Sequence, residues 1–206
     1  MPDNAVLVSF DDGFKNNLTL AAPLLAKYKI PAAVFVTTDY IGTSGQLFWA
    51  LELSQRLMNS DEDSVTLSGI TYPLPDTSHS ERSSSVIIIT NATKKIPANE
   101  RQIFLEDVRS KTDYDISAPW QKELYEFLTW DEVRTLRKQG IEIGCHTASH
   151  PILSALNPDE LDRELRESKK KIEQELGEEC DTIVYHAGLD TQLIQGDNFG
   201  YKRELR

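Results

Sequence analysis

Short apolar runs alternate along the chain with segments in which apolar residues recur every three or four positions. Residues 5–10 and 32–36 are two such runs, and both predict buried strands. Between them, the spacing of Leu20, Leu24, Leu25 and Tyr28 predicts a helix with these residues on its apolar side. A strand, a helix and a second strand within about 30 residues have the size of a parallel βαβ unit.

The same alternation returns in the last part of the chain. Two capping boxes, in which a polar side chain is followed three residues later by glutamate, predict helix starts at 129–132 and 157–160. A strand pattern follows each helix, at 141–145 and 182–185, and a last weak helix pattern reaches Tyr201.

The block between these regular parts, residues 46–119, is less regular, and we interpret it as a mainly helical insertion. Residues 48–58 and 99–111 carry apolar side chains at helical spacing. Residues 65–74 predict a small hairpin around a Ser-Gly pair. The run Val-Ile-Ile-Ile-Thr at 86–90 has the β-branched composition of a strand.

Strands that alternate with helices predict an α/β fold with a mainly parallel sheet, open or closed into a barrel. In such folds, ligands gather at the carboxyl edge of the sheet. The segments that leave the predicted strands carry Asp11, Asp12, His146, His150 and His186. Three of the chain's four histidines therefore fall on one predicted face. We expect the fourth, His79, in an exposed polar loop.

Length and charge restrict the classes of function. A chain of 206 residues is long enough for one domain, or for one domain with an insertion. Its formal net charge of −11 argues against nucleic acid as a partner, because the phosphates would be repelled. No apolar stretch approaches the roughly 20 residues of a membrane span, and the first residues lack the features of a signal peptide. We therefore expect no membrane contact and a cytoplasmic location.

A histidine pair four residues apart, joined by one carboxylate, has the ligand types of a catalytic zinc site. A second, adjacent carboxylate would then be free to accept a proton. Each element has a simpler interpretation on its own, since Asp-Asp-Gly is also an ordinary turn and two histidines can share a surface by coincidence. Cys145 could suggest a thiol nucleophile, but it alternates with His146 along the strand, so we interpret it as a core residue. With Cys180 it makes too few cysteines for a disulfide framework.

The sequence resembles the polysaccharide deacetylases with a NodB homology domain, which are carbohydrate esterases of family four. Residues 8–14, Val-Ser-Phe-Asp-Asp-Gly-Phe, resemble the first motif of that family, and residues 144–151, Gly-Cys-His-Thr-Ala-Ser-His-Pro, resemble the second. Residues 30–36 and 128–133 are similar to the segments around these motifs. The resemblance covers about residues 5–45 and 120–202, and it implies a single NodB-homology domain over residues 1–206.

The resemblance implies a distorted (β/α) barrel and a hydrolase that removes N- or O-linked acetyl groups from a carbohydrate. Asp11 would be the general base for water that a divalent metal, most simply Zn²⁺, activates. Asp12, His146 and His150 would be the metal ligands. Related proteins carry helical insertions after the second strand, which favours a helix at 86–95, against the strand pattern there.

The third motif of the family, Arg-x-Pro-Tyr/Phe-Gly, is replaced here by Val-Tyr-His-Ala-Gly at 184–188. Ala187 would still offer a backbone N–H to the oxyanion, with Tyr185 on the substrate side, although Tyr185 also fits a packing role. His186 is a candidate substitute for the general acid, which the family carries beyond Tyr201.

Four predicted strands do not close a barrel of seven or eight. We therefore expect a barrel that is incomplete at the C-terminus. Three explanations stay open: the chain is truncated, it is a natural remnant, or another chain complements it, with self-association as one such route. Two alternatives remain open. One is a catalytically impaired module that binds metal and glycan, and the other is a hydrolase of small amides.

Overall fold

The structure is a computed structural model that describes residues 6–115, 119–185, 201 and 203–205. The chain divides into two compact units. Unit 1 comprises Met1–Gln46 and Ser117–Arg206, and unit 2 comprises Leu47–Ile116. The limits of unit 2 fall close to those of the expected insertion at 46–119. That residues 1–206 form one single NodB-homology domain stays a prediction.

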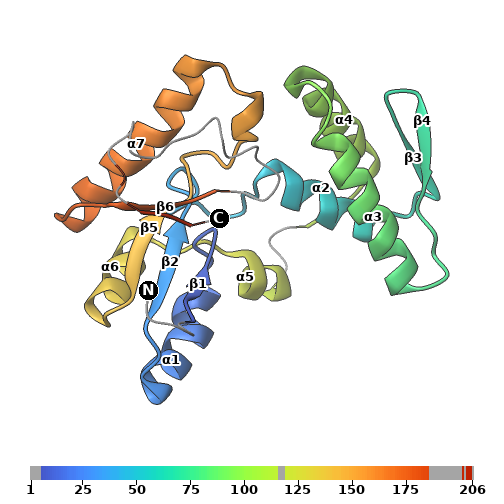
Figure 1. The fold of residues 1–206 in the computed structure, drawn as a ribbon. Coiled ribbons are helices and arrows are strands. Elements are labelled where there is room, and N and C mark those ends of the chain that lie inside the picture. The colour runs from blue at the N-terminus through green and yellow to red at the C-terminus, as the bar shows by residue number, and fades with distance from the viewer. Residues whose placement is uncertain (1–5, 116–118, 186–200, 202, 206) are drawn as a thin grey trace. The chain divides into compact units, whose positions relative to one another are not determined.

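Unit 1 is built on a five-stranded sheet in which every neighbouring pair is parallel (Figure 1). The parallel α/β fold expected from the sequence is therefore confirmed. In spatial order the strands are β1 (Val8–Phe10), β2 (Ala32–Val36), β5 (Glu142–Cys145), β6 (Thr182–Val184) and β7 (Arg203–Leu205). The last strand was not predicted, and most of the weak helix expected before Tyr201 lies outside the described residues.

Both predicted capping boxes begin helices of unit 1. Thr129 caps α6 (Trp130–Lys138), and Asn157 caps α7 (Pro158–Leu176). Both helices pack against β5 and cover the core of the unit. The other helical segments among the described residues of unit 1 are a π-helical turn η1 (Asn17–Ala21), α1 (Ala22–Tyr28), α5 (Pro119–Tyr125) and the 3₁₀ turn η2 (Leu153–Ala155).

The first strand and the first helix differ from the sequence prediction. The run before β1 is not buried, because β1 lies at one end of the sheet, and Val6 is 86% exposed. The predicted apolar side of the helix is confirmed for Leu25, which is buried with Ala22, but it is wrong for Leu24, which is 57% exposed. Leu20 and Tyr28 are exposed with Leu24. The side that faces the core carries Ala22 and Leu25, with Leu18 and Ala21 packed beside them at regular helical spacing.

Unit 2 contains three helices and one hairpin among its described residues, and it has its own apolar core. The helices predicted at 48–58 and 99–111 and the hairpin at 65–74 are confirmed. The elements are α2 (Trp49–Met58), β3 (Ser64–Leu67), β4 (Ile70–Pro73), α3 (His79–Thr93) and α4 (Ala98–Lys111). His79 is exposed, as expected, but it is the first residue of α3 rather than part of a loop.

The strand predicted at 86–90 is wrong, because these residues lie within α3. Val86 and Ile89, three residues apart, are buried in the core of unit 2, whereas Ile88 is 58% exposed. Tertiary packing of one helix face therefore outweighs the preference of β-branched residues for strands, which is a weak effect for each residue. The helix that the family resemblance implies for 86–95 is confirmed for all but its last two residues.

None of the helices among the described residues is long and apolar enough to cross a membrane.

Candidate metal centre

The two carboxylates that follow β1 lie in a tight turn. The N–H of Gly13 donates to the carbonyl oxygen of Asp11 at 2.9 Å, and both Asp12 and Gly13 have positive φ, of 72° and 84°. A Cβ atom at Gly13 would lie 2.9 Å from Ile41 Cδ1 and 3.1 Å from Val36 Cγ1. Both the backbone conformation and the available space therefore require glycine at this position.

Strand β2 lies between β1 and β5 in the sheet (Figure 1). Residues at its end form hydrogen bonds with the segments that follow both neighbouring strands. The N–H of His146, directly after β5, donates to the carbonyl of Val36 at 3.0 Å. The N–H of Thr37 donates to the carbonyl of Asp12 at 3.4 Å. The ends of three parallel strands thus bring the two sequence motifs to the same edge of the sheet.

Three side chains from these turns converge on one point. Asp12 Oδ1 lies 3.4 Å from His146 Nε2 and 3.2 Å from His150 Nε2. The three ligand atoms all lie within 4.8 Å of one another, and the two imidazole rings meet edge to face with centroids 5.1 Å apart. The sequence prediction named these three residues as ligands of one ion, and the described structure brings them together.

The orientation of the His146 ring suits a metal ligand. Its Nδ1 lies 3.1 Å from the carbonyl oxygen of Val184, which can only accept a hydrogen bond. The proton is therefore on Nδ1, and the lone pair of Nε2 faces Asp12. Burial lowers the pKa of His146, the neighbouring His150 adds to this effect, and the two aspartates oppose it. The neutral imidazole, which is the form that binds metals, is thereby favoured.

Asp11 is adjacent to this cluster but is not part of it. Its side chain keeps a solvent-exposed part, while burial of the rest raises the pKa of the carboxyl group. The charges of His146 and His150 lower this pKa, whereas that of Asp12 raises it. A carboxylate with an elevated pKa is a better proton acceptor than an ordinary surface aspartate.

The residues present fit a divalent metal with nitrogen and oxygen ligands. Two imidazoles and one carboxylate are the three protein ligands of many catalytic zinc sites, and such sites keep a further position for water or substrate. The hydrogen bond from His146 Nδ1 to a carbonyl is the support that metal-bound histidines usually have.

Comparison with known proteins identifies the family of the chain. The sequence profile described as polysaccharide deacetylase matches residues 1–197. The chain belongs to the polysaccharide deacetylase family. The resemblance of the two motifs to NodB-type deacetylases is thus confirmed at the level of the family. A search of curated protein sequences found no match.

Two solved structures show the same fold. One is the Streptococcus pyogenes deacetylase PplD in complex with acetate, with 17% identity and a TM-score of 0.53 over 98% of this chain and 56% of that chain. The other is IcaB from Ammonifex degensii, with 16% identity and a TM-score of 0.50 over 97% of this chain and 56% of that one. The present chain therefore spans little more than half the length of either.

The residues expected near the third motif are only partly described. Tyr185 directly follows β6 and is buried in the core of unit 1, which agrees with a packing role. His186 and Ala187 lie outside the described residues, so their roles as substitute acid and oxyanion donor stay predictions. Cys145 is fully buried, and burial raises the pKa of its thiol, so its assignment to the core is confirmed.

Sequence analysis missed Glu164, whose buried carboxylate contacts the segment between the two histidines. A signal for it was present. The buried side of α7 follows positions 161, 165, 168 and 172, and residue 164 lies on that same side, three after 161 and four before 168. A charged residue on the apolar side of a helix usually has a specific partner.

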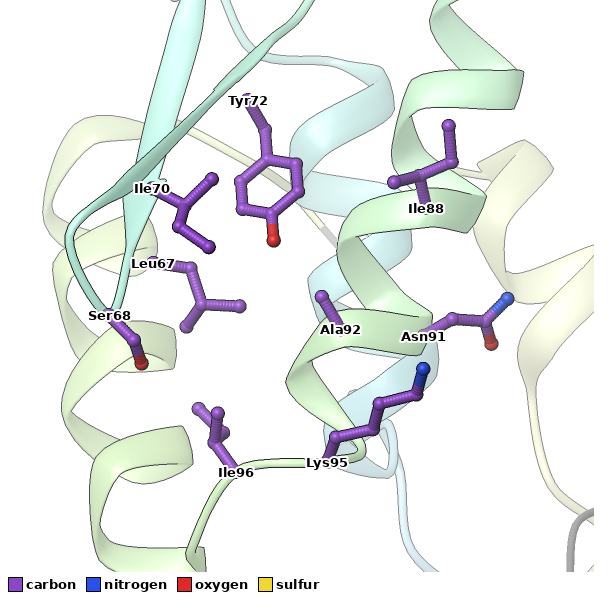
Figure 2. A pocket seen from close by; sticks show the side chains of 9 residues that line it. All are labelled: Leu67, Ser68, Ile70, Tyr72, Ile88, Asn91, Ala92, Lys95 and Ile96. Carbon is purple, nitrogen blue, oxygen red and sulfur yellow. The ribbon is translucent and has the colours of Figure 1, made fainter.

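A separate cavity of about 440 Å³ lies entirely within unit 2, between the β3–β4 hairpin and α3 (Figure 2). Figure 2 shows Leu67, Tyr72 and Ile88 around this space, with Lys95 at its border. All of its lining residues belong to unit 2, whereas the Asp12 cluster belongs to unit 1.

Proposed function

We propose that this protein hydrolyses acetyl groups, N- or O-linked, on a carbohydrate, with a divalent metal held by Asp12, His146 and His150. The observation that carries the proposal is the convergence of these three side chains beside Asp11, in a chain of the polysaccharide deacetylase family. Zinc is the first choice of metal, because two imidazoles and a carboxylate are typical zinc ligands.

The side chains divide the work between binding and proton transfer. When bound in such a site, zinc lowers the pKa of water towards about 7 and polarises a carbonyl group. Asp11 takes the proton from the water that attacks the acetyl carbonyl, for which its raised pKa is suited. His146 is held by the Val184 carbonyl and presents Nε2 throughout.

The remaining roles rest on the third motif of the sequence. The backbone N–H of Ala187 is our candidate donor to the tetrahedral oxyanion. His186 is our candidate for the acid that protonates the leaving group. If His186→Ala leaves turnover and its pH profile unchanged, this assignment is wrong.

The adjacent carboxylates allow a sharp test, because their replacements should have different effects. We expect Asp12→Ala to abolish stoichiometric zinc binding, measured by isothermal titration and elemental analysis. Asp11→Asn should keep zinc affinity close to that of the wild type but lower kcat for acetate release by roughly 10²- to 10⁴-fold. Oligomers of N-acetylglucosamine and an aryl acetate serve as amide and ester probes. Zinc binding that survives Asp12→Ala unchanged would refute the ligand assignment.

A second candidate function is favoured by one observation, the absence of arginine and proline from the third motif at 184–188. A module that binds metal and glycan without hydrolysing them would keep zinc binding and release no acetate from any acetylated sugar. A hydrolase of small amides would instead release acetate from acetamide derivatives that carry no sugar.

A further inference from the structure

Helix α7 places a buried carboxylate against the segment that joins the two histidines of the cluster. Glu164 is only 6% exposed. Its Oε2 accepts the N–H groups of Ala148 at 3.0 Å and Ser149 at 2.9 Å. Its Oε1 accepts the hydroxyl of Ser149 at 2.6 Å. All three donors lie between His146 and His150.

This segment has a backbone conformation that needs support. Thr147 and His150 have φ of 69° and 60°, in the left-handed region that side chains other than glycine rarely adopt. Such a conformation persists only when the surrounding contacts fix it.

The contacts of the segment come from two sides. Its carbonyl groups at Thr147 and Ala148 accept the N–H groups of Thr38 and Asp39, which follow β2, at 3.2 and 3.0 Å. Its N–H groups at Ala148 and Ser149 bind Glu164. The carboxylate is therefore the support on the side of α7.

The neighbouring N–H groups of the segment have partners of their own. The N–H of Thr147 donates to Cys145 Sγ at 3.3 Å, and that sulfur lies 3.0 Å from Ser168 Oγ, one turn after Glu164 on α7. The N–H of His150 donates to Thr147 Oγ1 at 3.2 Å. Within the described part of the chain, Glu164 satisfies the two N–H groups in the middle, and a side chain too short to reach them would leave them without this partner.

We propose that Glu164 is a positioning residue of the metal centre: by fixing residues 147–149 it keeps His150 Nε2 within reach of Asp12 and His146. The inference rests on the proposed function, because it assigns Glu164 a role towards the same metal. The position of Glu164 is itself fixed, since the capping box at Asn157 defines where α7 begins.

Four variants of the full chain separate reach from charge. Glu164→Ala removes the acceptor. Glu164→Asp keeps the charge but withdraws the carboxylate by one methylene group. Glu164→Gln removes the charge but keeps an oxygen for the two N–H groups, while its amide can donate to the Ser149 hydroxyl. Glu167→Gln is the matched control, because it removes a negative charge from an exposed position on the same helix.

The first readout is the dissociation constant for zinc, measured by competition with a chelator. We expect Glu164→Ala and Glu164→Asp to weaken zinc binding by roughly 10- to 100-fold, as supporting residues around metal ligands commonly do. Glu164→Gln and Glu167→Gln should stay within about threefold of the wild type. If Glu164→Ala does not fold, Glu164→Asp carries the test.

The second readout needs no metal. Amide hydrogen exchange of Ala148 and Ser149, followed by NMR, should speed up in Glu164→Asp and remain slow in Glu164→Gln.

The outcomes distinguish this inference from the proposed function. Wild-type protein that binds zinc, with unchanged affinity in Glu164→Ala and Glu164→Asp, overturns the positioning role and leaves the function intact. Equal weakening in Glu164→Gln and Glu167→Gln assigns the effect to charge and also overturns it. Wild-type protein that binds no zinc overturns the proposed function, and the positioning role with it.

Discussion

Replacing Gly144 by alanine should destabilise the protein through one identifiable collision. Gly144 lies in β5, two residues before His146, and it pairs with Phe35 of β2. A Cβ atom at this position would lie 2.4 and 2.5 Å from Phe35 Cε1 and Cδ1, and 3.2 Å from the carbonyl oxygen of Thr182. The ring of Phe35 therefore lies over the neighbouring strand, in the space that a side chain at residue 144 would otherwise occupy.

The size of the effect follows from how little the ring can move. Carbon atoms pack best at about 3.5–4.0 Å, so the new contact is too short by roughly 1 Å. Phe35 is 0% exposed and packs with Ala33 and Val184 in a small buried cluster. Overpacking of this kind typically costs about 1–3 kcal/mol. In a chain of 206 residues, that loss corresponds to a decrease in Tm of roughly 2–12 °C.

Urea unfolding followed by tryptophan fluorescence measures the loss, and a double-mutant cycle with Phe35→Leu identifies its cause. The smaller side chain should accommodate the new methyl group, so Gly144→Ala should cost less in the Phe35→Leu background, with a coupling of about 0.5–3 kcal/mol. An unchanged free energy of unfolding for Gly144→Ala, or an equal cost in both backgrounds, would refute the reasoning.

Three further predictions concern other parts of the chain. In unit 2, burial raises the pKa of Glu52, but hydrogen bonds from two arginines outweigh this effect and hold the pKa below its usual value. The stability that Glu52 contributes should therefore be present above its unfolded pKa of about 4.3 and be lost as the pH falls through its folded pKa. The difference in free energy of unfolding between wild type and Glu52→Gln, measured in urea, should become smaller as the pH is lowered. A constant difference from pH 7 to 3.5 would contradict this prediction. Asn157→Ala should cost about 1 kcal/mol by removing the cap of α7, while Asn157→Ser, which keeps a capping oxygen, should cost much less. Burial raises the pKa of the Cys145 thiol, and that of Cys180 to about 12, so iodoacetamide should label neither in the native protein at pH 7.5 and both in urea; native labelling of Cys145 would show that it is accessible.

The sequence was most informative where local chemistry determines structure without help from distant contacts. Both capping boxes begin helices at the expected residues. In each box, the capping side chain and the glutamate side chain accept a hydrogen bond from each other's backbone N–H within one turn, so no distant contact is needed. The run at 32–36 forms strand β2, since a continuous apolar stretch of that length fits the interior of a parallel sheet. The run at 141–145, which includes one glutamate, forms strand β5.

Prediction failed where the decisive contact is distant in sequence. The run at 86–90 has strand composition, but only the helices and hairpin that pack around it make one helix face the better solution. Leu20, Leu24 and Tyr28 have the spacing of a buried helix side, but packing in unit 1 buries the neighbouring side with Ala22 and Leu25 instead. Glu164 was missed because its partners, Ala148 and Ser149, are brought to it by the packing of α7 against β5.

The candidate site illustrates how topology can assemble what the sequence separates. Residues 47–116 lie between β2 and β5 along the chain, but the two strands pair in register from Ala33 with Glu142 to Val36 with Cys145. That register determines where along the strand direction His146 leaves the sheet. The register of β1 with β2 determines the position of Asp12 in the same way. The distance between the two ligands is therefore a property of strand pairing, and the length of the intervening segment does not enter it. The positions of the motifs at strand ends consequently predict which residues share the carboxyl edge of the sheet. The 3.4 Å separation of Asp12 Oδ1 and His146 Nε2, in contrast, depends on β2, the strand that pairs with both β1 and β5.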